Sequence, residues 1–276
     1  MSNAHYWNRK EALSKKAVEH TKEMQEQYSE EIRDAIKNSI IWSKDPNGIV
    51  VKEVNGERQI VNTKTIDLDK YKESSFKVSK RTTQEALFNS SEEHIVILNF
   101  ASYKNPGGRF IDGSSAQEEA LCHDSFLYNV LKELMDYYNW NREHLNRGLY
   151  TDRAIYTPNV RFFDKDGNTT VADVITCAAP NRSLMFRYNA FTDEENTKVL
   201  ESRVEFLRDI AYLSSGDARE IILGAWGCGV FRQDPKVVGE KIAKAFAKSP
   251  YNLVTFAIPD DTNLKPFISC FNGELE

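Results

Sequence analysis

Apolar positions in the first forty residues recur at three-, four- and seven-residue spacings. Leu13, Ala17, Met24, Tyr28 and Ile32 follow this spacing, with charged residues between them. The period matches one face of an α-helix, and the apolar stripe is short and poor in leucine. We therefore expect a helix that packs on the main domain rather than an independent coiled coil.

Three short apolar runs follow the expected helix and are separated by residues typical of turns. The runs span residues 40–43, 49–54 and 58–62. Asp45-Pro-Asn-Gly48 separates the first two, and Asn55-Gly56 separates the last two. Both sequences favour tight turns between paired strands. This segment is therefore predicted to form an antiparallel meander.

Beyond the meander, short apolar runs alternate with amphipathic stretches. We expect strands at 95–99, 154–163, 171–178, 220–224 and 253–258, and helices at 117–137, 194–213 and 235–248. This alternation favours an α/β fold, with a mixed sheet sandwiched between helices. No repeat, low-complexity tract or long linker interrupts the chain. We therefore expect one structural unit, in which residues 1–75 form a helical and hairpin elaboration packed on a core of residues 76–276.

Composition narrows the class of protein. The chain has 276 residues, of which 41% are apolar, and a formal net charge of −5. The apolar content excludes wholesale disorder, and the acidic balance argues against duplex nucleic acid as a partner. The sequence shows no secretion signal and no run of about 18 apolar residues that could span a membrane. Four widely spaced cysteines fit the reduced thiols of a cytoplasmic protein.

The loop after the predicted strand at 95–99 is the first candidate for a site, because ligands of open α/β sheets bind beyond the carboxyl ends of the strands. Asn99 ends this strand, and Asn105-Pro-Gly-Gly108 follows in the loop. The glycines would let backbone N–H groups approach a ligand closely. The same residues also fit an ordinary surface loop that leads to a helix capped near Ser115.

Glu118 and Glu119 begin that helix. Neighbouring side chains on a helix point about 100° apart, so we expect only one of the two carboxylates to face a reacting atom. The other would bind a hydroxyl group or cap the helix. A general acid needs a raised pKa, whereas a helix N-terminus lowers the pKa of a carboxyl. Acid catalysis here therefore requires desolvation or a negatively charged ligand.

The second candidate is the loop after the predicted strand at 220–224. Its glycines at 224, 227 and 229 precede Asp234-Pro235, which is typical of a helix N-cap and first turn. A strand, a glycine loop and a helix N-terminus together form an anion site suited to a pyrophosphate. The spacing matches neither G-x-G-x-x-G nor a Walker loop, which argues against a Rossmann dinucleotide site or a P-loop.

Three further features are less specific. Cys228 has no histidine near it in sequence, so a structural thiol is favoured over a nucleophile. The five histidines show no metal-ligand spacing, so no metal site is expected. The aromatic and basic run from Asn181 to Tyr188 fits a wall for a base or phosphate and a solvated loop with one buried ring equally well.

Taken together, the two loops resemble those of the microbial-type poly(ADP-ribose) glycohydrolases, a branch of the macrodomain superfamily. Asn99-Phe-Ala-Ser102, Asn105-Pro-Gly-Gly108 and Ala116-Gln-Glu-Glu119 are similar to the family's catalytic signature. The run Gly224-Ala-Trp-Gly-Cys-Gly-Val-Phe231 looks like its diphosphate-binding loop. The resemblance implies a macrodomain-like fold. It also implies that the ligand is ADP-ribose or poly(ADP-ribose), whether or not it is attached to a protein.

The resemblance also implies roles for individual residues, in a reaction that requires no cofactor or metal. Glu119 would be the catalytic acid and base, and Glu118 would bind a ribose hydroxyl. Asn105 would contact the distal ribose, and Gly107 and Gly108 would lie close to ribose and phosphate. The other binding residues that it implies are Asn99, Gln117, Gly227, Cys228, Gly229, Val230 and Phe231.

One position departs from the family's pattern. Arg109 stands where the family has its third glycine. Its side chain can point outward, pair with a phosphate or narrow the distal-ribose pocket. The leading hypothesis is an enzyme that cleaves ribose–ribose O-glycosidic bonds of poly(ADP-ribose) or ADP-ribose–protein bonds. The alternative, favoured by Arg109, is a macrodomain that binds ADP-ribose or a related nucleotide without turnover.

Overall fold

A single mixed sheet of nine strands organises the computed structural model, which describes residues 3–271. The strand order is β3-β2-β1-β6-β7-β5-β8-β9-β4. Neighbouring strands from β3 to β7 run antiparallel, and those from β7 to β4 run parallel. The strands are β1 (Ile40–Lys44), β2 (Val50–Val54), β3 (Glu57–Val61), β4 (Ser75–Ser79), β5 (Ile95–Phe100), β6 (Asp152–Phe163), β7 (Thr169–Cys177), β8 (Glu220–Leu223) and β9 (Leu253–Ala257).

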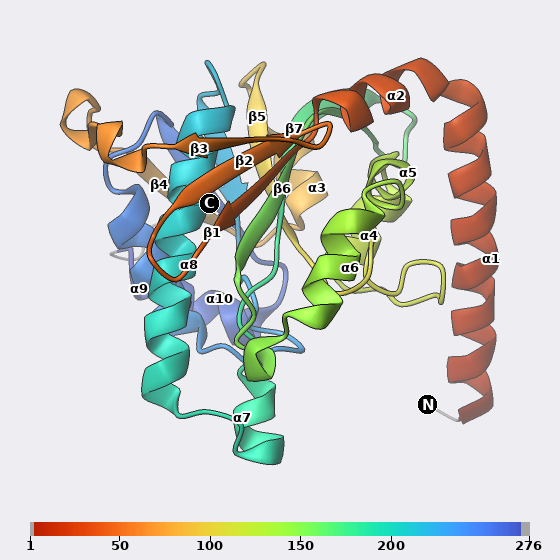
Figure 1. Cartoon of the computed structure of the whole chain (residues 1–276). Helices are drawn as coiled ribbons and strands as arrows, with labels where there is room; N and C mark the ends of the chain where they lie inside the picture. Colours follow the sequence, from red (N-terminus) through yellow and green to blue (C-terminus); the bar gives the residue numbers. More distant parts are fainter. Residues whose placement is uncertain (1–2, 272–276) are drawn as a thin grey trace.

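Helices cover both faces of the sheet, which confirms the predicted α/β sandwich (Figure 1). One face packs against α8 (Asp193–Ser214), α9 (Pro235–Phe246) and α10 (Asp261–Ile268). The other packs against α1 (Asn3–Gln27), α2 (Ser29–Asn38), α3 (Thr83–Phe88), α4 (Gln117–His123), α5 (Leu127–Leu131) and α6 (Met135–Glu143). The short helix α7 (Ser183–Tyr188) follows β7, and 3-10 turns span Thr63–Thr65, Leu68–Lys70 and Asn146–Gly148. Within residues 3–271, no helix is both long and apolar enough to cross a membrane.

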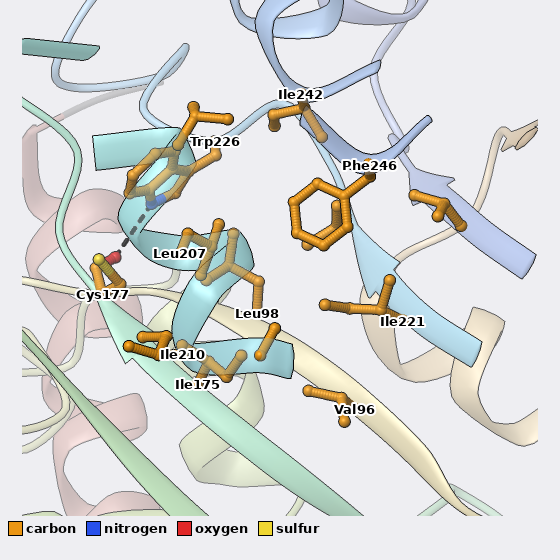
Figure 2. Packing of buried hydrophobic residues seen from close by; sticks show 14 of the residues in the cluster. Val96, Leu98, Ile175, Cys177, Leu207, Ile210, Ile221, Trp226, Ile242 and Phe246 are labelled. Atoms are coloured by element: carbon orange, nitrogen blue, oxygen red, sulfur yellow. Dashed lines mark hydrogen bonds between the residues drawn. The ribbon is translucent and has the colours of Figure 1, made fainter. Parts of the chain in front are cut away.

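The central strand β5 is buried on both sides, as its continuous apolar run predicts. Val96 and Leu98 point into the core beneath α8 and α9, where Figure 2 shows them facing Ile175 and Leu207. Ile95 and Ile97 belong to the core on the opposite face. Because both cores hold this strand, the position of the loop that follows it is fixed by the sheet.

The predicted strands are confirmed to within two residues at either end, and two helical predictions are wrong. The N-terminal helix is interrupted at Tyr28, which is the N-cap of α2. The helix expected over 117–137 is three short helices. Ser125 breaks it, because this residue bridges to Phe162 in β6 and its hydroxyl accepts a bond from the Leu127 N–H. A tertiary contact with the sheet thus overrides the helical period.

At the edge of the sheet opposite the carboxyl end of β5, His94 lies between two carboxylates. Its ring nitrogens are 2.9 Å from Asp173 and 2.7 Å from Asp217. Asp173 is buried and also accepts hydrogen bonds from the Tyr156 hydroxyl and the Asn159 backbone. Burial opposes the charged imidazolium, but the two carboxylates outweigh it and raise the pKa of His94.

We expect His94→Gln to lower the thermal midpoint by a few degrees at pH 5.5 and to change it little at pH 9. The histidine is charged in the native protein to a higher pH than in the unfolded chain. Its contribution to stability is therefore complete below its unfolded pKa and is lost as the pH rises through the raised one. Thermal unfolding of both proteins across this pH range tests this. An equal loss at both pH values would contradict the ionic role.

Candidate active site

The two candidate loops lie side by side, because they follow the neighbouring parallel strands β5 and β8. A cavity of about 480 Å³ opens between them. Ala101 and Gln117 line it from one loop, and Gly227, Val230 and Phe231 line it from the other. This volume is within the range of pockets that hold a small organic ligand.

Gln117 joins the end of β5 to the loop of residues 101–116, the candidate catalytic loop. Its side-chain oxygen accepts a 2.8 Å hydrogen bond from the Phe100 N–H, and its amide nitrogen donates to the Leu98 carbonyl at 2.9 Å and to the Thr83 hydroxyl. Both ends of the Gln117 amide are therefore bonded within the protein. The residue therefore fixes the start of α4 while its stem forms part of the cavity wall.

Glu118 is buried beneath the loop. One carboxylate oxygen accepts a 2.6 Å hydrogen bond from the Ser102 N–H, and the other accepts from the Asn99 amide at 3.2 Å. Burial raises the pKa of Glu118 to about 8; the hydrogen bonds oppose the rise, and the charge of Glu119 adds to it. Desolvation is thus the cause of the raised pKa of Glu118.

Glu119 closes the start of the same helix. Its two oxygens accept hydrogen bonds of 2.9 Å from the Arg109 and Ala116 backbone N–H groups. The bond to Ala116, which is the N-cap, caps the start of α4. The residue to which the resemblance gives the acid role is therefore also the one that caps the helix. The bond to Arg109 ties the helix to the glycine turn.

The two carboxylates converge on one point of the backbone, which is a correction to the divergence expected from helix geometry. A Cβ atom built on Gly108 would lie 2.5 Å from a Glu119 oxygen and 2.9 Å from a Glu118 oxygen. The turn holds this residue at a φ of +64° and its neighbour Gly107 at +62°. The loop thus lies over both flexible side chains, and only glycine leaves room for them.

The two asparagines occupy different environments. Asn99 is fully buried and donates to Glu118 and to the Thr176 hydroxyl, while its side-chain oxygen has no hydrogen-bond partner in residues 3–271. It lies behind Glu118 and positions that carboxylate. Asn105 is exposed at the tip of the loop, where its side chain is free to meet a ligand.

In the second loop, Gly227 has a φ of +75°, and a Cβ there would lie 2.6 Å from that of Ala179. Gly229 and Val230 are exposed, and Phe231 is half-buried against Tyr150. Asp234 caps α9 with bonds to the Lys236 and Val237 N–H groups, as predicted. The loop therefore presents backbone groups beside a helix N-terminus.

Cys228 is badly placed to be a nucleophile. Burial raises the pKa of its thiol far above the usual range, and its Sγ lies 3.7 Å from the Trp226 carbonyl. A thiol held in its protonated form is unreactive. No cluster of three or more potential metal ligands occurs among the described residues.

Arg109 points away from the glutamates. Its side chain is 62% exposed and pairs with Asp112 at 3.0 Å, while its backbone N–H supplies the bond to Glu119. Of the three orientations that the sequence allowed for Arg109, the structure therefore shows the outward one.

We expect Arg109→Gly to change kcat by less than about threefold, because an exposed ion pair contributes little and any residue supplies the backbone N–H. Steady-state kinetics of the two proteins test this. A gain in kcat of tenfold or more would show instead that the arginine obstructs the site.

The N-terminal helix α1 supports the catalytic loop, which Figure 1 shows reaching toward it. The Ser14 hydroxyl donates a 2.6 Å hydrogen bond to the Ile111 carbonyl. A side chain at Gly113 would collide with the backbone of Lys10. Residues about a hundred positions apart in the chain therefore fix the shape of one loop.

The sequence analysis did not identify two walls of the cavity. One is Thr82–Gln84 at the start of α3, and the other is 258–260 with Asn263 at the start of α10. Each wall had a signal, since Thr82-x-x-Glu85 forms a capping box and Pro259 follows a predicted strand. Short helices have weak periodicity, so neither signal predicts a wall of the cavity.

Comparisons with known proteins agree with this geometry. The profile of the microbial-type PARG catalytic domain matches residues 8–165. Among solved structures, poly(ADP-ribose) glycohydrolase from Thermomonospora curvata is 26% identical, with a TM-score of 0.75 over 95% of this chain and 98% of that one. Its complex with the inhibitor ADP-HPD superposes over the same shares with a TM-score of 0.73 and 26% identity.

A third structure, the glycohydrolase from Deinococcus radiodurans in complex with ADP-ribose, is 32% identical. The aligned part covers 72% of this chain and 84% of that chain, with a TM-score of 0.64. A search of curated proteins gave no match.

Proposed function

The chain belongs to the microbial-type poly(ADP-ribose) glycohydrolase family, and from that premise we propose that it hydrolyses the ribose–ribose bonds of poly(ADP-ribose). One observation carries the proposal. Two buried carboxyl groups lie at the same point beside Gly108, and burial raises the pKa of one of them, Glu118, to about 8. A protonated carboxyl is the group that glycosidic cleavage needs first.

In this proposal the diphosphate of the terminal ADP-ribose unit lies in the cavity against Gly227 to Phe231. Its distal ribose points out of the cavity toward Gly108, which, like Glu118 and Glu119, is not part of the cavity lining. Exposed backbone N–H groups and the α9 N-terminus suit the two phosphates. Phe231, packed on Tyr150, closes the ribose end. The backbone of Gly107 and Gly108 lets the sugar approach the glutamates, because no Cβ stands between them.

In the reaction, Glu119 gives its proton to the leaving ribose oxygen as the bond from the anomeric carbon breaks. Positive charge develops on the ribose that contains the anomeric carbon, and the carboxylate left behind stabilises it. The same carboxylate then takes a proton from the attacking water, which restores the acid. Glu118, held by Ser102 and Asn99, accepts a ribose hydroxyl and keeps the sugar in place.

We place the enzyme in the cytoplasm. Cys122, Cys177, Cys228 and Cys270 are all unpaired, as is usual where thiols are kept reduced. This proposal rests on cysteine usage alone and is independent of the site.

Calorimetry with ADP-ribose, run beside a turnover assay with poly(ADP-ribose), tests the proposed function. We expect one ADP-ribose to bind per chain and free ADP-ribose to be released from the polymer. Binding without turnover would instead favour a macrodomain that only recognises its ligand. The absence of both would exclude ADP-ribose as the ligand.

A further inference from the structure

A surface of exposed aromatic and basic side chains borders the diphosphate loop, and the proposed reaction does not use it. It comprises Phe186, Arg187 and Tyr188 of α7 with Val230 and Arg232 of the loop, and we call it the α7 rim. Tyr188 is 73% exposed, Phe186 56% and Val230 76%. In Figure 1, α7 projects at the lower end of the molecule, away from the sheet.

The α7 rim is fixed to the site by hydrogen bonds and packing. The Ser183 N–H donates to the Phe231 carbonyl at 3.0 Å, and the Arg182 guanidinium donates to the Arg232 carbonyl at 3.3 Å. Leu184 packs so closely on Gly148 that no other residue would fit there. Because of these contacts, the exposed rings keep a fixed position relative to Phe231.

The charge of the rim favours an anionic ligand. Arg182 pairs with Asp193, and Arg147 pairs with Glu195, so these two acidic side chains are already neutralised. The side chains of Arg187 and Arg232 are exposed and have no ion-pair or hydrogen-bond partner in residues 3–271. Two unpaired guanidinium groups beside two exposed rings thus stand out in a chain whose net charge is −5.

We propose that the α7 rim binds the ADP-ribose unit on the leaving-group side of the scissile bond. The inference rests on the proposed function, which places the terminal unit in the cavity. Val230 and Phe231 form the wall of the cavity on the side of α7, and no residue of α7 lines the cavity. Phe231 packs against Ala101 and Tyr103, which flank the Ser102 that donates to Glu118, so the scissile bond lies at this end of the cavity. The next unit of the polymer then extends beyond Phe231, where the rim begins.

The chemistry of that unit matches the rim. It carries an adenine, which stacks on Phe186 or Tyr188, and a diphosphate, which Arg187 and Arg232 can bind. Val230 belongs both to the rim and to the cavity wall, so the two binding surfaces are continuous. The segment that the sequence left open between a ligand wall and a solvated loop is thus assigned to the ligand.

The double variant Arg187→Ala with Tyr188→Ser tests the proposal, with Arg33→Ala on the distant helix α2 as a matched surface control. Both target residues are exposed, so the fold is expected to survive. Four quantities are compared. They are KM for poly(ADP-ribose), KM for a mono-ADP-ribosylated protein, KM for an ADP-ribosyl aryl glycoside whose leaving group is not a nucleotide, and Kd for ADP-ribose. The polymer assay is repeated over a range of salt concentrations.

We expect the variant to raise KM for the polymer about tenfold, since one stacked base and one phosphate contact are lost. Its polymer KM should also depend less steeply on salt. The aryl glycoside and ADP-ribose should behave as with the wild type, and Arg33→Ala should change nothing.

Three results would overturn the proposal. An unchanged polymer KM would show that the rim binds no polymer, and an equal loss on the aryl glycoside would mean a distorted site. A loss confined to mono-ADP-ribosylated proteins would make the rim a protein-docking surface. Failure of the proposed function is distinguishable, because the wild type itself would then cleave neither substrate.

Discussion

Glu119→Gln is expected to lower kcat for poly(ADP-ribose) hydrolysis by about a thousandfold or more, because an amide can neither donate the acid proton nor activate water. ADP-ribose affinity should stay within about threefold, since the cavity and the diphosphate loop are untouched. The substitution preserves size, and the glutamine oxygen can still accept one of the two backbone bonds, from Arg109 or Ala116. Single-turnover kinetics with calorimetry measures both quantities.

The matched control is Glu143→Gln, which makes the same chemical change at an exposed site at the end of α6. It should leave kcat and Kd unchanged. A Glu119→Gln protein that retains a tenth or more of wild-type kcat would rule out Glu119 as the acid. Loss of binding together with activity would indicate a distorted loop rather than missing chemistry, and thermal unfolding identifies that case.

Glu118→Gln is expected to lower kcat/KM about a hundredfold and, at the same time, to stabilise the protein at alkaline pH. The activity falls because a ribose hydroxyl loses the carboxyl group that orients it. The fold can accommodate the amide, since the unpartnered oxygen of Asn99 can accept its N–H once the Asn99 amide turns over. Stability rises because a buried charge is removed.

The pH dependence of that gain follows from the raised pKa of Glu118, about 8 in the native protein. Below the unfolded pKa of about 4.3 the side chain is neutral in both states, so the substitution changes little. As the pH rises toward 8, the unfolded chain loses its proton first, and the wild type is progressively destabilised. The difference in thermal midpoint should grow over this window and level off above it. A constant difference would contradict the assignment.

The strands could be predicted from sequence because their signal is local. Ile95 to Asn99 is apolar throughout, and the turn at Asn55-Gly56 fixes the neighbouring hairpin. The break at Ser125 could not be predicted, since it depends on a pairing with Phe162 far along the chain. The division of the chain at about residue 75 stays a prediction.

The site was predictable as a set of residues but not as an arrangement. The glycine pattern and the glutamates indicate the loops after β5 and β8 as the site. The sheet brings these two loops together, because β5 and β8 are neighbouring parallel strands. Helix geometry alone suggested that Glu118 and Glu119 diverge. They converge because the Gly108 turn lies over both, and α1 holds this loop through Ser14 and Gly113. Such long-range packing leaves no periodic trace in the sequence.

The most direct test is to identify the nucleotide that the wild-type protein releases from poly(ADP-ribose), by chromatography with mass detection. The account predicts free ADP-ribose as the product, because the bond broken is the glycosidic one between riboses. Release of a phosphoribosyl nucleotide would instead mean cleavage at the pyrophosphate. That product, or intact polymer alongside tight ADP-ribose binding, would contradict a glycohydrolase.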